Sequence, residues 1–433
     1  MNHSTFATRA RAMLKSALQQ CRAAAFALMA LLTLSNVSIQ SAQAAIGTID
    51  VAPAATLLLP YFEVDLANDN GKQTAFRVSN TSATAMLVNV TLWTDLGVPT
   101  YNFPIYQPGY TTTDVDLRLL FKGIMPITAS AGQDPTDRIS PRGQLSQDIN
   151  FASCNGILPL PGLLASATVT ALRNAHTGIG STLLSGNCGG VTRGDNIARG
   201  YITMDAVNQC GGQAYPSDAG YFGDGGSGKA TNQNVLTGSV TYLNRSQNMA
   251  YGDPLVHVEA SATNPLTASG TDRNTFYGRY VGFTGVDNRE PLAAVSQARY
   301  MNGGAFTGGS EFMVWRDSGA AVAPFACGGS AAGYPLTQTE VVAFDEQENA
   351  TKFVGNAFPY ATQLVASSAL TPYTFGFLRM HLGMTTGAAA VAGRQQSYVS
   401  VRHTASGLYG GSLPAGQLFN ASAPAASIST VLP

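Results

Sequence analysis

The sequence has little charge. Only 11% of its 433 residues are Asp, Glu, Lys or Arg, and the formal net charge is −1. No basic patch is present that could neutralise phosphates, which argues against a nucleic-acid partner. After residue 44, no apolar run is long enough to cross a membrane as a helix. No C-x-x-C pair occurs and no His lies at ligand spacing from a Cys, so a zinc site of that kind is not expected.

Residues that could act as catalysts are scarce as well. The sequence Gly328-Gly329-Ser330-Ala331-Ala332 lacks the second glycine of a nucleophile elbow. After residue 44 the chain has four histidines, and none has a sequence-local partner that would indicate a catalytic triad: His176, His257, His381 and His403. The sequence therefore favours a non-catalytic protein over an enzyme.

The N-terminal residues have the order of a cleaved export signal. Four basic residues and no acidic residue precede or border an apolar run, Ala23 to Leu34, and Ala42-Gln43-Ala44 provides a small-residue cleavage site. We therefore expect residues 1–44 to be a signal peptide. The expected location is outside the cytoplasm, whether periplasmic, on the cell surface or secreted.

The cysteines fit that location. Cys21 would leave with the signal, and the four that remain are Cys154, Cys188, Cys210 and Cys327. An even number of cysteines in an exported chain predicts two disulfides, with three pairings open. We favour Cys154–Cys188 and Cys210–Cys327, because the first pair brackets one short helical segment.

Alternating residues predict a mainly β fold. In residues 88–93, Val88, Val90 and Leu92 alternate with polar or aromatic positions at a period of two. Short strands of this kind recur between turns rich in Gly, Pro and Asn, which is typical of β-sandwiches of immunoglobulin-like type. One or two short helices are also expected, over residues 161–178 and 289–299.

Three pairs of similar segments occur in the same order along the chain. They are Thr74–Val78 with Ser310–Val314, Val88–Trp93 with Val341–Phe344, and Gly200–Asp205 with Gly376–His381. We interpret them as two related β-sandwich domains, residues 45–210 and 301–433, on either side of a middle insertion or connecting segment, residues 211–300. The alternative is chance similarity among short strands.

Two groups of residues are candidate metal ligands. His257 and Glu259 are two apart in an expected strand, so their side chains project from the same face. Asp345, Glu346 and Glu348 form an acidic run at the end of another strand, where oxygen ligands suit Ca²⁺. The alternatives, which we favour, are a solvated or cross-strand-paired face and a solvated turn that protects an edge strand. No other cofactor is expected.

A third group combines aromatic and charged residues within a short stretch. It could form a polar pocket or a carbohydrate-binding surface, or a buried ion-pair network that fixes the middle segment on a sandwich. We favour the structural role. Its members are Tyr277, Arg279, Asp287, Arg289 and Glu290.

Several stretches resemble a family of uncharacterised exported bacterial proteins. They are L-L-L-P-Y-F-E-V-D-L, A-R-G-Y-I-T-M-D, F-Y-G-R-Y, D-N-R-E-P-L, V-W-R-D and A-F-D-E-Q-E-N. The similarity runs through most of the chain after the signal. The family has no established activity, so the resemblance implies only an exported, disulfide-bonded protein and assigns no catalytic residues.

Together these observations predict an exported, non-catalytic protein that binds a ligand or builds a surface structure. Sandwich loops and edges offer surfaces for an extracellular or cell-surface protein or a glycan. The rival hypothesis is an extracellular hydrolase, metal-dependent or not, with a site in the middle segment built from His257, Glu259 or Glu290.

Overall fold

The fold is mainly β, as the sequence predicts, with four antiparallel sheets. The computed structural model describes residues 52–126, 163–210, 214–260, 274–284, 286–303, 308–385, 395–405 and 409–418. All of them belong to one compact unit, Ala45–Pro433. The predicted signal peptide and Cys154 lie outside the described residues. The immunoglobulin-like subtype of the sandwiches stays a prediction.

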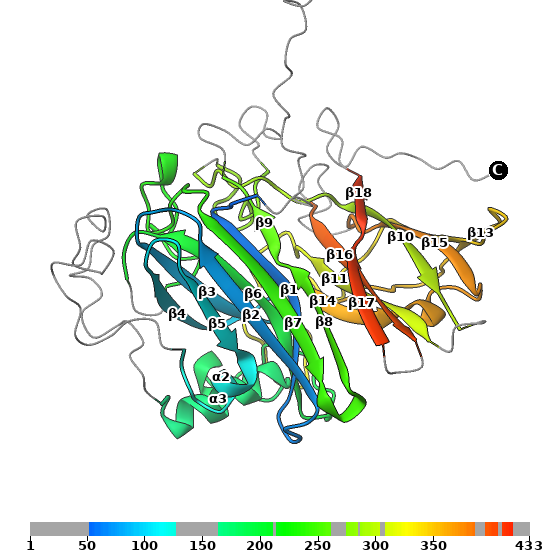
Figure 1. Ribbon diagram of the computed structural model, residues 1–433, viewed down its shortest axis with the longest axis horizontal. Coiled ribbons are helices and arrows are strands. Elements are labelled where there is room, and N and C mark those ends of the chain that lie inside the picture. The colour runs from blue at the N-terminus through cyan, green and yellow to red at the C-terminus, as the bar shows by residue number, and fades with distance from the viewer. Residues whose placement is uncertain are drawn as a thin grey trace, which may run out of the picture. The chain divides into compact units, whose positions relative to one another are not determined.

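The first nine strands form two sheets, with the orders β4-β3-β6-β1-β9 and β5-β2-β7-β8 (Figure 1). These sheets share one apolar core, to which β1, β2, β3, β6 and β7 contribute side chains from both layers. We call this sandwich the first repeat. Its strands are β1 (Thr56–Asp65), β2 (Lys72–Asn80), β3 (Met86–Thr94), β4 (Pro99–Gln107), β5 (Thr112–Asp116), β6 (Ile197–Val207), β7 (Leu236–Asn244), β8 (Met249–Pro254) and β9 (Val256–Val258).

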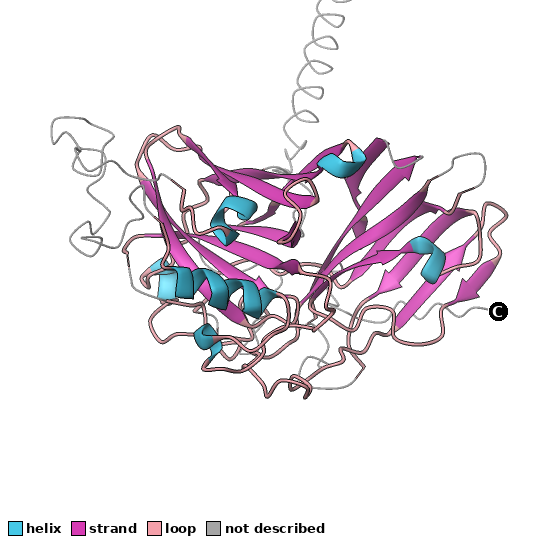
Figure 2. Ribbon diagram, turned by 90° about the horizontal axis from the view of Figure 1, so that it is seen from below, coloured by secondary structure: helices cyan, strands magenta, loops and turns pink. Residues whose placement is uncertain are grey.

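The last nine strands repeat the same arrangement, with the orders β13-β12-β15-β10-β18 and β14-β11-β16-β17. Adding nine to each strand number of the first repeat reproduces both orders. This second repeat has its own apolar core, and Figure 2 shows the strands as two groups. Its strands are β10 (Val295–Met301), β11 (Gly309–Arg316), β12 (Glu340–Phe344), β13 (Ala350–Lys352), β14 (Thr362–Ala366), β15 (Phe375–His381), β16 (Ser397–Ala405), β17 (Tyr409–Pro414) and β18 (Gly416–Leu418).

The three pairs of similar segments lie on equivalent strands of the two repeats, namely β2 and β11, β3 and β12, and β6 and β15. The register agrees as well, because Trp93 pairs with Tyr201 where Phe344 pairs with Phe377. The rings of both pairs stack, with centroids 5.6 Å and 4.5 Å apart. Sequence similarity, strand order and register therefore all support an internal duplication.

The segment 211–300 contributes strands to both repeats. β7 pairs with β2 and β8 pairs with β7, while β9 pairs with β1. β10 pairs with β15 and β18 of the second repeat. The helix expected over residues 289–299 is therefore wrong. Val295 and Ala298 are spaced as on a helix, but hydrogen bonds to strands on both sides hold this segment extended.

Among the described residues, the helices are short and lie mostly in the first repeat. The helix expected over residues 161–178 is confirmed in part as α3 (Ser166–His176), which buries Ala171, Leu172 and Ala175. Gly178, at φ +74°, follows its C-terminus, as glycine commonly does. The others are α2 (Leu117–Phe121) and the 3₁₀ turns η3 (Thr182–Leu184), η4 (Asp224–Gly226), η5 (Arg245–Gln247) and η6 (Ser367–Ala369). Within the described ranges, no helix is long and apolar enough to cross a membrane.

β1 lies at the centre of the molecule and is buried on both faces. Leu57 and Leu59 enter the first core, whereas Leu58 joins an aromatic cluster shared by the two repeats. That cluster combines Trp93 and Tyr201 of the first repeat with Trp315 and Tyr398 of the second. It also includes Phe276 and Tyr277, which belong to the segment between the repeats, from the end of β9 to the start of β10. Pro60 lies within β1, where the pairing with β6 shifts register between Leu59 and Phe62.

Candidate binding cleft

His257, a predicted metal ligand, has both ring nitrogens bonded to backbone groups. Nδ1 donates to Ala52 O at 2.8 Å, and Nε2 accepts from Gly238 N at 3.3 Å. The side chain is 1% exposed, and burial lowers its pKa. Glu259 follows β9, where its carbonyl accepts a hydrogen bond from Glu290 N at 2.8 Å. The histidine therefore helps to attach β9 to the first repeat.

The acidic run at the end of β12 forms a turn. The Asp345 carboxylate accepts hydrogen bonds from Gln347 N and Asn349 N, at 2.9 and 2.8 Å, and the amide of Asn349 lowers its pKa. Glu346 pairs with Arg299 at 2.9 Å, and Glu348 has a φ of +64°. In the part of the chain that the structure describes, no group of three or more His, Cys, Asp or Glu side chains could hold a metal ion.

The mixed aromatic and charged group lies inside the protein, where it forms part of a network centred on Asp205. Tyr277 Oη donates to both carboxylate oxygens of Asp205, at 3.0 and 3.1 Å, and Tyr221 Oη donates at 2.6 Å. Arg289 Nε lies 3.8 Å from Asp205, and its Nη1 lies 3.2 Å from Asp287. Burial raises the pKa of Asp205, and Arg289 opposes the shift.

A second buried pair joins the segment between the repeats to the second repeat. Arg279 pairs with Asp317 and donates to Tyr201 Oη at 3.2 Å. Gln396 donates to Asp317 at 3.1 Å and accepts from Leu292 N at 3.1 Å. The group from Tyr277 to Arg289 thus forms a buried ion-pair network, the structural role favoured from the sequence, and Glu290 beside it is half-buried. Asp205 and Asp317 were missed because they lie far from this group in the sequence.

One disulfide connects the two repeats. Cys188 is bonded to Cys327, which is 139 residues away, so the predicted pairings Cys154–Cys188 and Cys210–Cys327 are wrong. The backbones of Cys188 and Phe325 exchange two hydrogen bonds, of 2.9 and 3.0 Å, which bring Cys327 alongside. Cys210 is also disulfide-bonded. Proximity in sequence misled the prediction, because the pairing follows a bridge between distant segments.

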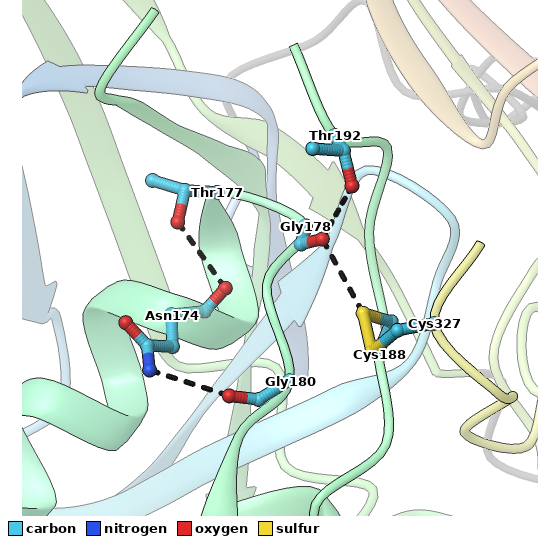
Figure 3. The surroundings of a disulfide bond; sticks show 7 residues. All are labelled: Asn174, Thr177, Gly178, Gly180, Cys188, Thr192 and Cys327. Carbon is cyan, nitrogen blue, oxygen red and sulfur yellow. Dashed lines mark hydrogen bonds between the residues drawn. A yellow bond between two sulfur atoms is a disulfide. The ribbon is translucent and has the colours of Figure 1, made fainter. Parts of the chain in front are cut away.

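The surroundings of this disulfide hold the segment after α3 in place (Figure 3). Gly178 O accepts a hydrogen bond from Thr192 Oγ1 and lies 3.3 Å from Cys188 Sγ. Because a disulfide sulfur has no hydrogen to donate, the second approach is a van der Waals contact. Asn174 Nδ2, near the end of α3, donates to Gly180 O at 3.3 Å. These contacts hold Cys188 and Thr192 beside the C-terminus of α3.

A cleft of about 410 Å³ opens between the repeats next to this segment. One wall comes from the first repeat, with residues of β1, β2 and β6 and the loop before β6. The other wall comes from β14 and the loop before it. The lining residues are Tyr61, Glu63, Lys72, Arg193, Arg199, Asn356, Ala357, Pro359, Tyr360, Gln363, Leu364 and Val365.

Each cation of the cleft has a carboxylate partner. Lys72 Nζ lies 2.7 Å from Glu63, Arg199 lies 2.6 Å from Asp195, and Arg193 pairs with Asp95. The side chains of Asp95 and Glu63 are only 4% and 6% exposed. Burial raises the pKa of Asp95, and Arg193 opposes the shift. These pairs fix the cationic groups in the wall of the cleft.

Arg193 is positioned by both repeats. Val191 N donates to Asp95 Oδ1 at 3.0 Å, which places the loop over the end of β3. The Arg193 guanidinium then lies 5.3 Å from the centre of the Tyr360 ring, a cation–π distance. The cleft residues come from five separate segments and form no local motif, so no pattern in the sequence indicates them.

Two further histidines, His176 and His403, lie in structural contacts. His176 is buried between Phe62 and Phe121, with ring centroids 5.4 Å away on each side. Its Nδ1 donates to Arg199 O at 2.9 Å, and its Nε2 lies 2.8 Å from Thr100 Oγ1. His403 lies 2.8 Å from Ser310 Oγ, but Ser310 is 2% exposed and its oxygen also accepts from Met301 N. That serine is therefore shielded from a substrate.

In comparisons with known proteins, no protein family, curated protein or solved structure matches this chain.

Proposed function

We propose that this is an exported, non-catalytic binding protein that holds a polar ligand in the cleft between its two repeats. One observation carries the proposal. The cleft concentrates fixed cations, hydrogen-bonding groups and a tyrosine ring in a hollow of ligand size, since ligand pockets usually measure about 300–1,000 Å³.

Export is supported by the signal-like N-terminus and by the Cys188–Cys327 bond, because disulfides persist mainly in oxidising compartments. The hydrolase hypothesis has less support. Its residue His257 is engaged by backbone groups on both nitrogens and is almost fully buried. The surface or structural role expected from the sequence does not conflict with ligand binding, because one surface protein can serve both roles.

The binding proposal is tested by thermal unfolding of the oxidised chain 45–433 in the presence of a panel of soluble sugars, organic acids and amino acids. A ligand of the cleft stabilises the folded state by mass action and raises the midpoint. We expect at least one compound class to do so in the original protein and not in Lys72→Met. Stabilisation by no class, or equal stabilisation of the variant, would contradict the proposal.

Export is tested separately by fractionating cells that express the full chain and measuring the mass of the recovered protein by mass spectrometry. We expect it outside the cytoplasm, with its mass matching a chain that begins at Ala45. A full-length protein retained in the cytoplasm would show that the N-terminal residues are not a signal.

A further inference from the structure

We infer that the cleft recognises a carboxylate-bearing saccharide, such as a uronic-acid unit within a glycan. This inference rests on the proposed function and gives its ligand a chemical class. It draws on the placement of charge, the mixture of donors and acceptors, and the size of the hollow.

The charge in the cleft wall is mostly positive. Three cations line the hollow, and Glu63 is the carboxylate among the described lining residues. The partners of the two arginines do not line it, because Asp95 is buried behind Arg193 and Asp195 lies outside. The positive ends of these ion pairs therefore lie closer to a bound ligand than the negative ends do. An anionic group in the hollow would gain from this arrangement.

The cations suit a carboxylate in particular. Arginine presents planar donors that match carboxylate geometry, and hydrogen bonds between charged groups are roughly twice as strong as neutral ones. The side chains of Lys72, Arg193 and Arg199 are 34%, 27% and 14% exposed, so ligand access remains while their positions stay restricted.

The other lining groups suit a sugar ring. Hydroxyl groups need donors and acceptors close together, and Asn356, Gln363 and Glu63 line the cleft. Asn356 Nδ2 donates to Leu336 O at 2.6 Å and Gln363 Nε2 donates to Ala357 O at 3.0 Å, and each amide nitrogen carries a second hydrogen. The half-buried ring of Tyr360 offers an apolar surface beside a polar group, which suits the mixed faces of a sugar.

Two lysines allow a matched test. Lys72 in the cleft and Lys122 outside it each lie 2.7 Å from a carboxylate, and their side chains are 34% and 39% exposed. The experiment is calorimetric titration of the oxidised chain 45–433, and of its Lys72→Met and Lys122→Met variants, with trigalacturonate. We expect Lys72→Met to weaken binding about tenfold, the loss of one charge-assisted hydrogen bond. We expect Lys122→Met to bind as the original does.

Three further titrations distinguish failure of carboxylate recognition, of sugar recognition and of ligand binding altogether. Added salt should weaken trigalacturonate binding, because the cations are partly exposed. Equal binding of its neutral methyl ester would overturn carboxylate recognition while leaving a saccharide-binding cleft. Tighter, Lys72-dependent binding of tetraglutamate would overturn the sugar and leave the binding function. No binding of trigalacturonate would overturn this inference alone if another compound still stabilises the protein through Lys72. If none does, the proposed function fails too.

Discussion

At the scale of single residues, the protein buries charge to join its parts. Asp205 is fully buried in β6, yet it receives hydroxyl groups from Thr56, Tyr221 and Tyr277 and faces Arg289. A buried carboxylate left without such partners would be strongly destabilising. The network therefore specifies how the segment between the repeats lies on the first repeat, since another arrangement would leave these charges unpaired.

Replacing Asp205 by Asn tests this role. The variant keeps the shape of the side chain but removes the charge that faces Arg289, and we expect a loss of about 2–3 kcal/mol in the free energy of unfolding. Urea denaturation of the oxidised protein measures it. The control is Asp114→Asn, since the Arg77–Asp114 pair is largely exposed and should contribute little. Equal midpoints for both variants would show that the buried network is dispensable.

His176 predicts a dependence of stability on pH. Burial lowers its pKa from 6.5 to about 4, so the unfolded chain binds a proton in this range that the folded protein does not. The stability that His176 contributes is therefore complete above pH 6.5 and is lost as the pH falls towards 4. The loss amounts to roughly 3 kcal/mol at most.

Urea denaturation across this pH range checks the histidine. We expect His176→Gln to flatten the curve, although it should also lower stability at neutral pH. His403→Gln serves as the comparison and should flatten it less, because His403 is only half-buried. An unchanged pH dependence in His176→Gln would be the contrary result.

At the scale of elements, the same local structure occurs twice. Gly200 in β6 and Gly376 in β15 each lie beside the backbone of the neighbouring strand, ahead of a stacked aromatic pair. An added Cβ would lie 1.9 Å from Trp93 O in the first repeat and 1.7 Å from Phe344 O in the second. The glycines are required at both positions because backbone occupies the space of a side chain.

We therefore expect Gly200→Ala and Gly376→Ala each to destabilise the protein severely, by about 4 kcal/mol or more if the chain still folds. Gly309→Ala is the matched control, since its added Cβ would meet only Met301 O, at 3.9 Å. Thermal unfolding and the yield of folded protein measure the effect. Normal folding of Gly200→Ala or Gly376→Ala would mean that the position concerned is not tightly packed.

The pairing of the four cysteines after the predicted signal gives a second prediction at this scale. Cys188 and Cys327 are bonded to each other, and of the four cysteines after the predicted signal only Cys154 and Cys210 then remain. Peptide mapping without reductant should yield a Cys188–Cys327 peptide and a Cys154–Cys210 peptide. A Cys210–Cys327 or Cys154–Cys188 peptide as the main product would contradict the connection between the repeats.

Sequence patterns predict where helices and strands lie better than they predict which strands and cysteines pair. Alternation in β3, the helical spacing of α3 and the three similar segments all identify elements that exist. The failures at β10 and at the disulfide have one cause, because both are decided by contacts with strands or loops far away in the sequence. The cleft was missed for the same reason: Lys72, Arg193 and Tyr360 carry no shared local pattern.

At the scale of the whole molecule, the two repeats share a strand order but are not interchangeable. Equivalent outer positions of β2 and β11 are Arg77 and Ser79 in the first repeat, and Met313 and Trp315 in the second. Met313 and Trp315 are buried in clusters shared with the first repeat, whereas Arg77 is exposed. The apolar face of the second repeat thus covers β1. The cleft lies where the two repeats meet beside it.

Hydrogen exchange of the oxidised chain 45–433, with and without trigalacturonate, tests the central claim that the junction of the repeats is the binding site. We predict slower exchange in residues 61–72, 191–199 and 356–365, which come from both repeats and line the cleft. The outer face of the β5-β2-β7-β8 sheet should not change. Protection confined to a single repeat, or to that outer face, would contradict the account.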